Sequence, residues 1–548
     1  MKVLVLDIET NLAHDTIWCC VTKGNWFPAR DGNVFTHGQG GLQDLIKEAD
    51  IIVGHNIIGF DGPLLSKLWG IKIPVRKVRD TLVMSRLWNP QLEGGHSLRM
   101  WGQRLGDFKD EFTDFDGGLT QEMVTYCRQD VHVTTLLYEK LDKELKDYGY
   151  SVELEHRIAW IMKRQEDNGF KLNEKDAISL LAQLKDRMSD ITDHLQNIFP
   201  PIVEERWSEK TGKQLKDRVT VFNVGSRKQI AERLQERGVK FTKTTEKGTI
   251  IVDEGTLKGI DLPEAQLIAE YLMIQKRVGL LESWIDNVKD DGRVHGRVIT
   301  NGAVTGRMTH QKPNMGQIPS VNSEYGAECR ALWGVTDGNV LVGTDLSGIE
   351  LRCLAHYMQD DEWTEELLNG DIHQKNADAA GITRPQAKTL IYATLYGAGP
   401  AKIGSIVGGG AREGQEVLSR FYANTPALSR LMEKVKKVAV KGYVPGLDGR
   451  RIIVRSEHAA LNSLLQGCGA IIAKQWCIEA HKQFKRFRLP VRQVAFVHDE
   501  IQIETSQRDA EDVAMWMTTS ATLAGKVLGV RCRVDAESKI GNNWFDTH

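Results

Sequence analysis

The sequence predicts a multidomain α/β protein with a helical region in its middle. At 548 residues the chain is too long for a single hydrophobic core, which indicates about three to four domains or subdomains. Short strand-like apolar runs alternate with helical stretches over residues 1 to about 148, and again after about 290. Between these regions, apolar residues recur every three or four positions, which is the spacing of amphipathic helices.

The first element is the strand-like run MKVLVLDIET, which carries Asp7 and Glu9. Side chains alternate along a strand, so both carboxylates leave it on the same face and lie close together. Two carboxylates about 6 Å apart repel each other, and a cation should hold them. For these two residues alone, a solvated acidic turn at the end of an edge strand is an equal alternative.

Two later segments supply more acids. IIVGHNIIGFD contains a second strand-like run followed by Asp61, and in YCRQD the residues Tyr126 and Asp130 share one face of a helix. Mg²⁺ and Mn²⁺ prefer carboxylate oxygens, so the four acids predict a hard divalent cation site. Two ions about 4 Å apart would activate a water for phosphodiester cleavage, with Tyr126 orienting that water. The set resembles the three exonuclease motifs of DnaQ-like 3′-5′ proofreading nucleases.

The helical region contains two matching apolar stripes, from Leu184 to Ile198 and from Leu267 to Val288. We expect two long helices that pack together as an elongated subdomain. The polar, lysine-rich segment 200–220 lies between them, and it is expected to be a loop at the far end.

The next informative stretch, NVLVGTDLSGIELRCLAHYM, predicts a strand that ends at Asp345 and a helix that begins near Ser347. Ser347 and Glu350 match a capping box, which is the ordinary explanation of Glu350. An acid at a strand terminus is a common ligand position, so Asp345 is a candidate metal ligand.

Between residues 381 and 399, GITRPQAKTLIYATLYGAG predicts a helix that starts with a capping box of Thr383 and Gln386 and has Pro385 in its first turn. One face carries two cations followed by two aromatic residues. Such a face can hold a triphosphate with its base stacked beyond it, although inward-packed tyrosines on an ordinary helix are an alternative. These residues are Arg384, Lys388, Tyr392 and Tyr396.

Near the C-terminus, VRQVAFVHDEIQIE predicts a hairpin whose turn carries His498, Asp499 and Glu500. An acidic turn is usually only solvated, but this one follows a buried strand. Asp345 and Asp499 therefore form a second candidate pair of metal ligands.

Composition limits the protein class. Hydrophobic residues make up 41% and charged residues 26%, as in soluble globular proteins. No run approaches the roughly 20 apolar residues of a membrane span, and we expect an intracellular protein. The eight cysteines have no metal-ligand spacing and are expected to be buried free thiols. With a net charge of −2, nucleic acid would have to bind local patches such as 434–442 and 482–488.

Together, the stretches around Asp345, Arg384 and Asp499 resemble motifs A, B and C of family A DNA polymerases, in particular those of the T-seven phage group. The resemblance covers nearly the whole chain. It includes DGRVHGRVITNGAVTGRMTHQKPNMGQIP, EYGAECRALWG, GDIHQKNA, GLDGRRIIVRSEHAALNSLLQG and KIGNNW. It implies a ribonuclease H-like (DnaQ-like) exonuclease domain followed by a right-hand polymerase. The implied boundaries are 1–148 for the exonuclease and 149–548 for the polymerase, with the thumb at about 150–289, the palm at about 290–361 and 462–548, and the fingers at about 362–461.

This resemblance implies a template-directed DNA polymerase of the phage replicative type with a 3′-5′ proofreading exonuclease, both using two Mg²⁺ ions, for which Mn²⁺ can substitute. Asp345, Asp499 and the carbonyl of Leu346 would hold the ions of the polymerase site. The dNTP would contact His373, Arg384 and Lys388 through its phosphates, Tyr392 near the sugar and base, Tyr396 at the nascent pair, and Glu350 as a ribose gate. Primer-template DNA would contact Arg307, Asn462 and Gln466 in its minor groove, and His498 and Glu500 at the primer end.

Two details of the resemblance carry separate expectations. Tyr392 stands where most of the wider family has Phe, which implies ready incorporation of dideoxynucleotides. The phage relative has a long basic insertion between its thumb helices that recruits host thioredoxin, whereas only segment 200–220 lies here, so thioredoxin binding is doubtful. We expect a monomer, in the host cell cytoplasm if it is of phage origin, with a replisome helicase or primase as a candidate partner.

Two other classes compete with this interpretation. A stand-alone nuclease with a DNA-binding module would not need Asp345, Asp499, Arg384 and Lys388. A single-subunit RNA polymerase is disfavoured by Glu350 and by the acids of the N-terminal region.

Overall fold

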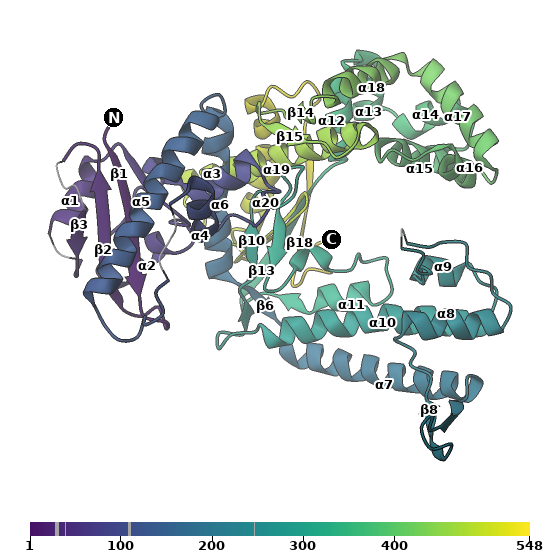
Figure 1. The fold of residues 1–548 in the computed structure, drawn as a ribbon. Coiled ribbons are helices and arrows are strands. Elements are labelled where there is room, and N and C mark those ends of the chain that lie inside the picture. The colour runs from purple at the N-terminus through teal and green to yellow at the C-terminus, as the bar shows by residue number, and fades with distance from the viewer. Residues whose placement is uncertain (28–31, 39, 108–110, 246) are drawn as a thin grey trace.

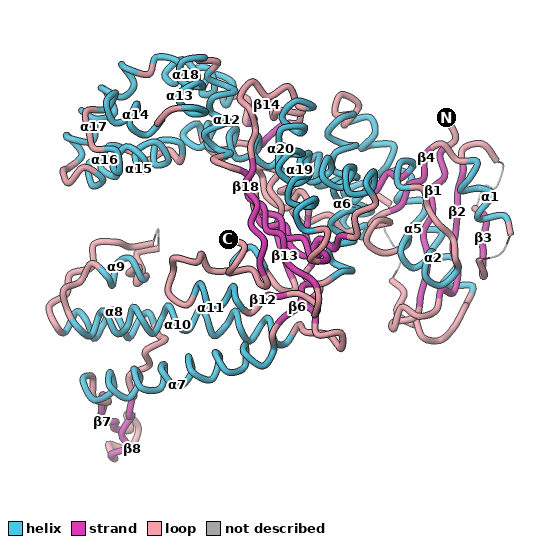
Figure 2. Tube along the Cα trace, turned by 180° about the vertical axis from the view of Figure 1, so that it is seen from behind, coloured by secondary structure: helices cyan, strands magenta, loops and turns pink. Residues whose placement is uncertain are grey.

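The computed structural model describes residues 1–27, 32–38, 40–107, 111–245 and 247–548. An N-terminal α/β domain lies at one side of the molecule (Figure 1). The rest is built around a central sheet, from which two groups of helices project in the same direction. Seen from behind, the strands of this sheet gather where the two helical groups meet (Figure 2).

The N-terminal domain is a five-stranded sheet in the order β3-β2-β1-β4-β5. β1 pairs antiparallel with β2 and parallel with β4, so it is a central strand. Leu4, Leu6 and Ile8 pack on one face of the sheet, and Val5 packs on the other face with α5. The strands are β1 (Val3–Thr10), β2 (Ile17–Gly24), β3 (Asn33–Phe35), β4 (Ile51–Gly54) and β5 (Val78–Asp80), and the helices are α1 (Gly41–Glu48), α2 (Asp61–Trp69), α3 (Thr81–Trp88), α4 (Leu98–Leu105) and α5 (Gln121–Glu144).

The next helix, α6 (Gly149–Asn168), joins the N-terminal domain to the central sheet. It packs against α3 on one side and against β10, β16 and α19 on the other. Its buried residues Leu154, Ile158 and Met162 belong to the large core of the C-terminal part. The sequence-based boundary places this helix at the start of the thumb, but its apolar face packs on the central sheet.

The two long helices predicted from the apolar stripes are confirmed as α7 (Glu174–Ile198) and α10 (Pro263–Asp286), which pack side by side. The loop expected at 200–220 is wrong: this segment forms a hairpin of β7 (Ile202–Trp207) and β8 (Gln214–Thr220). Its β-branched residues pair across the strands, with Val203 opposite Val219, although both side chains are exposed. Two shorter helices complete this arm, α8 (Arg227–Glu236) and α9 (Glu254–Lys258).

The central sheet is antiparallel, in the order β16-β17-β13-β18. The helix α19 is largely buried and packs against α20, which in turn covers the sheet. The sheet strands are β13 (Asn339–Leu346), β16 (Val491–Val497), β17 (Glu500–Ser506) and β18 (Ala536–Gly541), with helices α19 (Ala460–Phe487) and α20 (Ala510–Val527). Around it lie β6 (Phe170–Leu172), β9 (Arg293–Val294), β10 (Arg297–Ile299), β11 (Thr309–Gln311), β12 (Trp333–Gly334) and α11 (Gly326–Ala331).

The second helical group lies between β13 and α19 along the chain. It consists of α12 (Ile349–Met358), α13 (Asp361–Asn369), α14 (Ile372–Ala380), α15 (Arg384–Leu395), α16 (Pro400–Ile406), α17 (Ala411–Asn424) and α18 (Pro426–Ala439), followed by β14 (Tyr443–Pro445) and β15 (Arg451–Ile453). All eight cysteines are buried free thiols, as predicted. Over the described ranges, no helix has both the length and the apolar character needed to cross a membrane.

Candidate active sites in two domains

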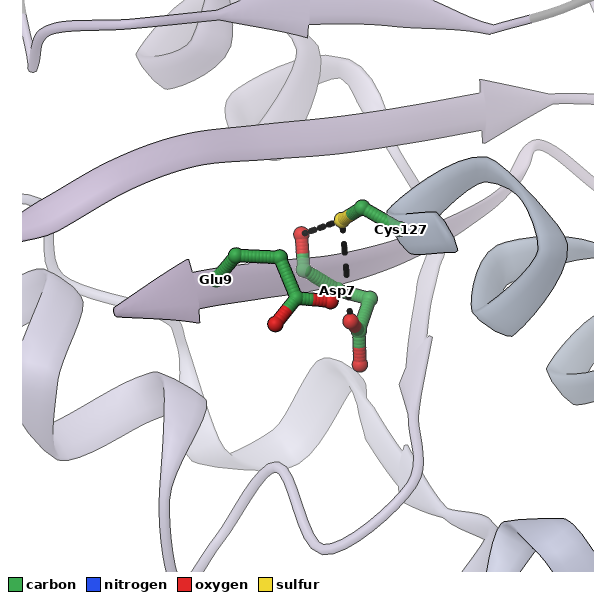
Figure 3. Close-up of side chains that lie close together, drawn as sticks. All are labelled: Asp7, Glu9 and Cys127. Carbon is green, nitrogen blue, oxygen red and sulfur yellow. Dashed lines mark hydrogen bonds between the residues drawn. The ribbon is translucent and has the colours of Figure 1, made fainter. Parts of the chain in front are cut away.

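Asp7 and Glu9 leave β1 on the same face, beside Cys127 of α5 (Figure 3). One ligand atom from each of these three residues lies within 4.8 Å of the others. Glu9 is buried and Asp7 is partly exposed. Because β1 is an inner strand of the sheet and Glu9 is buried, the alternative of a solvated acidic turn on an edge strand is excluded.

Two further elements bring Asp61 and Asp130 to this strand. Asp61 is the first residue of α2, and its Oδ1 accepts a hydrogen bond of 3.2 Å from the backbone N–H of Ile8. Burial, followed by the charges of Asp80 and Asp130, raises the pKa of Asp61 to about 7. Asp130 is buried on α5. The four predicted acids thus come from β1, α2 and α5, with Asp61 bonded to β1 and Asp130 near enough for its charge to act on Asp61.

The Cys127 thiol was not predicted as part of this site. Its Sγ lies 3.5 Å from the backbone oxygen of Asp7 and 3.6 Å from Asp7 Oδ2. Burial raises the pKa of this thiol well above its usual range, so it stays protonated and donates to Asp7. The sequence contained a signal, because Cys127 precedes Asp130 by three positions and therefore shares its helix face.

Tyr126 lies one helical turn before Asp130 and is partly exposed. Its ring contacts those of Phe112 and Phe115, with centroids 5.7 and 6.2 Å away. Tyr126 thus belongs to a group of three aromatic rings, and it lies on the helix that also carries Cys127 and Asp130.

The second site is formed where two strands of the central sheet end. Asp345 is the penultimate residue of β13, and Asp499 lies in the turn between β16 and β17. The backbone N–H of Leu346 donates to the backbone oxygen of Asp499 over 3.1 Å, which fixes the turn beside β13. Burial of the carboxyl, followed by the charge of Asp499, raises the pKa of Asp345 to about 7 even though its side chain reaches solvent. The two acids therefore lie close enough for the charge of Asp499 to act on Asp345.

Glu350 lies beside this pair. Its Oε1 accepts hydrogen bonds from Arg307 Nη2 at 3.2 Å and from the Tyr396 hydroxyl at 2.8 Å. The expected capping box is wrong, because α12 starts after Gly348 in a left-handed conformation (φ 55°) and has no side-chain cap. The Glu350 carboxylate is therefore available to other groups. With Arg307 and Asp499 it lines a pocket whose floor is α19.

Two residues of the β16–β17 hairpin have different environments. His498 is exposed in the turn and has a φ of 58°. Burial raises the pKa of Asp499, and the interactions of Asp499 with His498 and Arg307 reduce this rise. Glu500 is not a turn residue but the start of β17, and it is buried. Its carboxylate binds Trp544, Gln502, His548 and Arg330. This network contradicts the expected direct contact of Glu500 with DNA.

The α15 helix starts as predicted, with Thr383 as N-cap, Pro385 in the first turn, and a Thr383 N–H to Gln386 Oε1 hydrogen bond of 3.0 Å. Arg384 pairs with Asp371 at 2.6 Å, and Lys388 is exposed one turn further on.

The other residues expected at the nucleotide lie around this helix. Burial and then the charges of Arg384 and Lys388 lower the pKa of His373, so the neutral imidazole lies close to these two cations. Tyr392 is partly buried; burial raises its pKa, and the charges of Glu350 and Asp499 add to the effect.

Asn462 and Gln466 lie one turn apart on α19, partly exposed, and Gln466 Nε2 donates to Asn462 Oδ1 over 2.9 Å. Further along the same helix, sequence analysis missed a buried ionic cluster. Glu155 Oε1 accepts from both Arg450 Nη1 and Lys474 Nζ at 2.6 Å, and Lys474 also donates to the carbonyl of Gly306. The only sequence signal was the single charge in the apolar run GAIIAKQW.

Both acidic sites fit hard divalent cations. Their charged donors are carboxylate oxygens, and the neighbouring Cys127 thiol is held protonated. Asp61 and Asp345 each have a pKa near neutrality, so a bound cation would favour the charged form of both.

The fold and the two acidic clusters define a class: a two-domain protein with one carboxylate cluster in each part of the chain, of the kind that holds metal ions in phosphoryl-transfer enzymes. The family model "DNA polymerase family A" matches residues 202–546. The chain belongs to the family A DNA polymerases and is a DNA-directed DNA polymerase. Enzymes of this family depend on metal ions.

Two curated relatives are DNA-directed DNA polymerases of phages. The protein of Enterobacteria phage T3 is 35% identical over 100% of both chains, and that of Escherichia phage T7 is 36% identical over 92% of this chain and 94% of its own. A solved structure, the POL domain of Pol1 from M. smegmatis in complex with DNA primer-template and dNTP, has a TM-score of 0.82 at 19% identity, covering 100% of this chain and 96% of its own. The predicted fold, an exonuclease domain of the ribonuclease H type followed by a right-hand polymerase, is confirmed.

Proposed function

We propose that the chain replicates DNA at the site of Asp345 and Asp499 and removes mispaired primer ends at the site of Asp7, Glu9, Asp61 and Asp130. The observation that carries this proposal is the presence of two separate carboxylate clusters, one in each domain. Two Mg²⁺ ions at each cluster, or Mn²⁺ in their place, suit such oxygen donors. Primer-template DNA and dNTPs are the proposed ligands, as in the M. smegmatis complex.

In the polymerase site, Asp345, Asp499 and the Leu346 carbonyl would hold the ions. When bound, these ions lower the pKa of the primer 3′-hydroxyl and neutralise the triphosphate and the departing pyrophosphate. Arg384 and Lys388 would supply positive charge for the phosphates, and the neighbouring His373 would donate a hydrogen bond to them.

Three side chains near these acids would select and orient the nucleotide. Arg307 and Tyr396 fix the carboxylate of Glu350 from two sides, so Glu350 can exclude a ribose 2′-hydroxyl by occupying its place. Tyr392 lies nearby and would contact the sugar, consistent with the expected acceptance of dideoxynucleotides.

The remaining contacts are to the primer end and its duplex. Arg307, Asn462, Gln466 and His498 are at least partly exposed around the pocket and along α19, where a duplex minor groove and the primer terminus can reach them. Glu500 would act indirectly, by bracing the strand that follows Asp499.

In the exonuclease site, Asp7, Glu9, Asp61 and Asp130 would hold the ions, which activate a water when bound. The Cys127 thiol orients the Asp7 carboxylate by donating to it. Tyr126 would orient the attacking water or the terminal nucleotide from the mouth of the site. The subdomain limits proposed here differ from the sequence-based ones only in that α6 belongs with the palm.

Two substitutions, one in each site, test whether synthesis and primer degradation occur at separate sites. The substrate is a labelled primer with a mismatched 3′ end, in Mg²⁺ and with defined nucleotide sets. Asp7→Ala should abolish primer degradation and spare extension of a matched primer. Asp499→Ala should have the reverse effect. Loss of both activities from either change would contradict two independent sites.

A further inference from the structure

A basic pocket lies between the two domains, separate from both acidic clusters. Its walls come from the loop between β4 and α2, from α3, from α6 and from β10. The charged side chains that line it are Asp80, Arg86, Lys163, Glu166 and Arg297. Neither the polymerase nor the exonuclease mechanism above uses any of them.

The acids of this pocket are already engaged. Asp80 accepts backbone N–H groups of Asn56, Ile58 and Leu82 at 2.9 to 3.1 Å. Glu166 lies 3.4 Å from Lys163 Nζ, which also pairs with Asp167 at 2.7 Å. Arg86 and Arg297 are not engaged in this way. Among the residues that the structure describes, no carboxylate lies within ion-pair distance of either guanidinium group.

The protein holds these two arginines close together. Arg297 Nη2 reaches Asn56 Oδ1 at 3.4 Å, and the backbone oxygen of Arg86 accepts a hydrogen bond of 2.9 Å from Asn301 Nδ2. Burial and then the charge of Arg297 lower the pKa of Arg86. The charge of Asp80 offsets part of this repulsion, and an anion between the two arginines would offset more of it.

The position of the pocket between the N-terminal domain and the polymerase part indicates which anion would bind there. Asn56 begins the turn that leads to Asp61, and its backbone oxygen accepts the N–H groups of Gly59 and Phe60 just before α2 starts. The pocket wall is therefore continuous with the loop that delivers one acid of the exonuclease site. Its opposite wall, β10, belongs to the polymerase part.

We infer that Arg86 and Arg297 bind a backbone phosphate of the DNA strand whose 3′ end lies in the exonuclease site. This inference rests on the proposed exonuclease function. One arginine comes from each domain, so the bound strand would bridge them. A phosphodiester has the single negative charge and the oxygen acceptors that two guanidinium groups recognise.

Hydrolysis of two kinds of substrate tests the inference. Oligothymidylates of increasing length would extend from the acids into the pocket, whereas the p-nitrophenyl ester of thymidine 5′-monophosphate occupies only the acidic site. Arg86→Gln and Arg297→Gln should each raise KM about tenfold for long oligomers, leave kcat unchanged, and leave hydrolysis of the ester unchanged. The length at which variant and wild type begin to differ measures how many nucleotides separate the pocket from the acids.

Salt dependence and two further variants sharpen this test. Each substitution should reduce the slope of log KM against log salt concentration by about 0.7, the value for one phosphate contact on single-stranded DNA. Lys47→Gln removes one positive charge from α1, at the far side of the domain (Figure 1), and should change neither KM nor slope. Arg86→Lys should restore part of the binding.

Three different results would refute the phosphate contact, the binding role of the arginines or the proposed exonuclease function, and they can be told apart. Variants that hydrolyse long oligomers as wild type does would refute the phosphate contact. Equal losses on oligomers and ester would show that the arginines only support the fold. A wild-type protein that hydrolyses neither substrate would refute the exonuclease function itself.

Discussion

The two acidic sites differ in how the fold completes them. The exonuclease acids come from β1, α2 and α5 of one domain, and a hydrogen bond from Ile8 to Asp61 links two of these elements directly. In the polymerase site the acids lie on the central sheet, whereas the residues proposed to bind the triphosphate lie on α14 and α15. The hydrogen bond from Tyr396 to Glu350 joins these two parts. The polymerase site therefore depends on packing between subdomains, whereas the four acids of the N-terminal cluster all come from one domain.

The sites are alike in their electrostatics. Burial raises the pKa of Asp61 and of Asp345 to about 7, although Asp61 is 2% exposed and Asp345 reaches solvent. In each case a second carboxylate adds to the effect. The carboxyl groups of Asp61 and Asp345 should therefore ionise fully when a cation binds beside them.

The largest expected effect comes from removing one charge at each site. Asp61→Asn should lower hydrolysis of single-stranded DNA about a thousandfold, and Asp345→Asn should do the same to primer extension, because each removes a metal ligand charge. The amide at position 61 can still accept the N–H of Ile8, and an unfavourable buried charge is lost. The free energy of unfolding should therefore stay equal or rise.

Activity assays on both variants, together with thermal unfolding, check this prediction. Asp44→Asn is a control on the exposed face of α1, where only a weak pair with Lys47 is lost. If Asp61→Asn also lowered primer extension on matched DNA, the independence of the two sites would be refuted.

The next effect concerns α6, the helix that joins the two parts. Glu155 is fully buried between Arg450 and Lys474, which are also buried. Glu155→Gln should cost about 3 kcal/mol, because it leaves the buried Lys474 without a carboxylate, whereas Arg450 keeps its pair with Asp448. Glu153→Gln is the matched control on the same helix, where the pair with Arg157 is partly exposed and should contribute less than about 1 kcal/mol.

Activities retained after incubation in urea distinguish the two parts of the chain. In the Glu155 variant, primer extension should be lost at a lower urea concentration than in wild type, while hydrolysis of single-stranded DNA should change less. Equal shifts of both activities would show that the two domains unfold as one unit.

A smaller, pH-dependent effect comes from His156, the neighbour of Glu155. It is buried, accepts the N–H of Asp80 at Nε2 over 2.7 Å and donates from Nδ1 to the carbonyl of Val152. Burial lowers the pKa of His156 to about 4, whereas an unfolded histidine titrates near about 6.5. Below pH 6.5 the unfolded chain takes up a proton that the native state excludes, so stability falls, by about 2 kcal/mol at pH 5.

The free energy of unfolding measured between pH 7 and pH 4 should therefore decrease less steeply in His156→Gln than in wild type. Gln can still accept the N–H of Asp80, so the neutral form keeps one contact. His37→Gln, at an exposed position, should leave the slope unchanged. A wild-type slope in the His156 variant would exclude this histidine as a source of acid sensitivity.

Local patterns in the sequence predicted those features that depend on neighbouring residues. Alternation along β1 placed Asp7 and Glu9 on one face, and Thr383 with Gln386 marked the start of α15. The apolar stripes predicted α7 because its buried residues are three, four or seven positions apart and so share one face. These signals lie within one element, so no knowledge of the tertiary structure is needed.

Features that depend on distant residues were not predictable in this way. Glu155 is 295 residues from Arg450 and 319 from Lys474. Glu350 matched a local capping pattern, but the N-cap of α12 is Gly348, which has no capping side chain. The Glu350 carboxylate instead accepts a hydrogen bond from Arg307. Burial of Glu500 depends on Trp544 and His548 near the C-terminus. In each case a tertiary contact overrides the local pattern.

The smallest effect is expected far from both sites, at the hairpin of β7 and β8. Its side chains are exposed nearly throughout, including Trp207 at 57% and Val203 at 58%, and its strands pair mainly with each other. Replacing 202–220 with a short Gly-Ser linker keeps the packing of Phe199 against Phe222 at the base. Single-nucleotide addition and single-stranded DNA hydrolysis should therefore change by less than about twofold, because surface changes away from packed features rarely matter.

Product lengths on a long template, with and without host extract, then show whether the hairpin has a separate role. Products as long as those of wild type in both conditions would mean that processivity comes from other contacts. Shorter products without extract would assign the hairpin a contact with DNA, and shorter products only with extract would assign it a protein partner. Trp207→Ser is the matched variant, since it keeps the strands and removes the largest exposed apolar side chain of the hairpin. A loss of single-nucleotide addition in either variant would contradict the separation of this arm from the polymerase site.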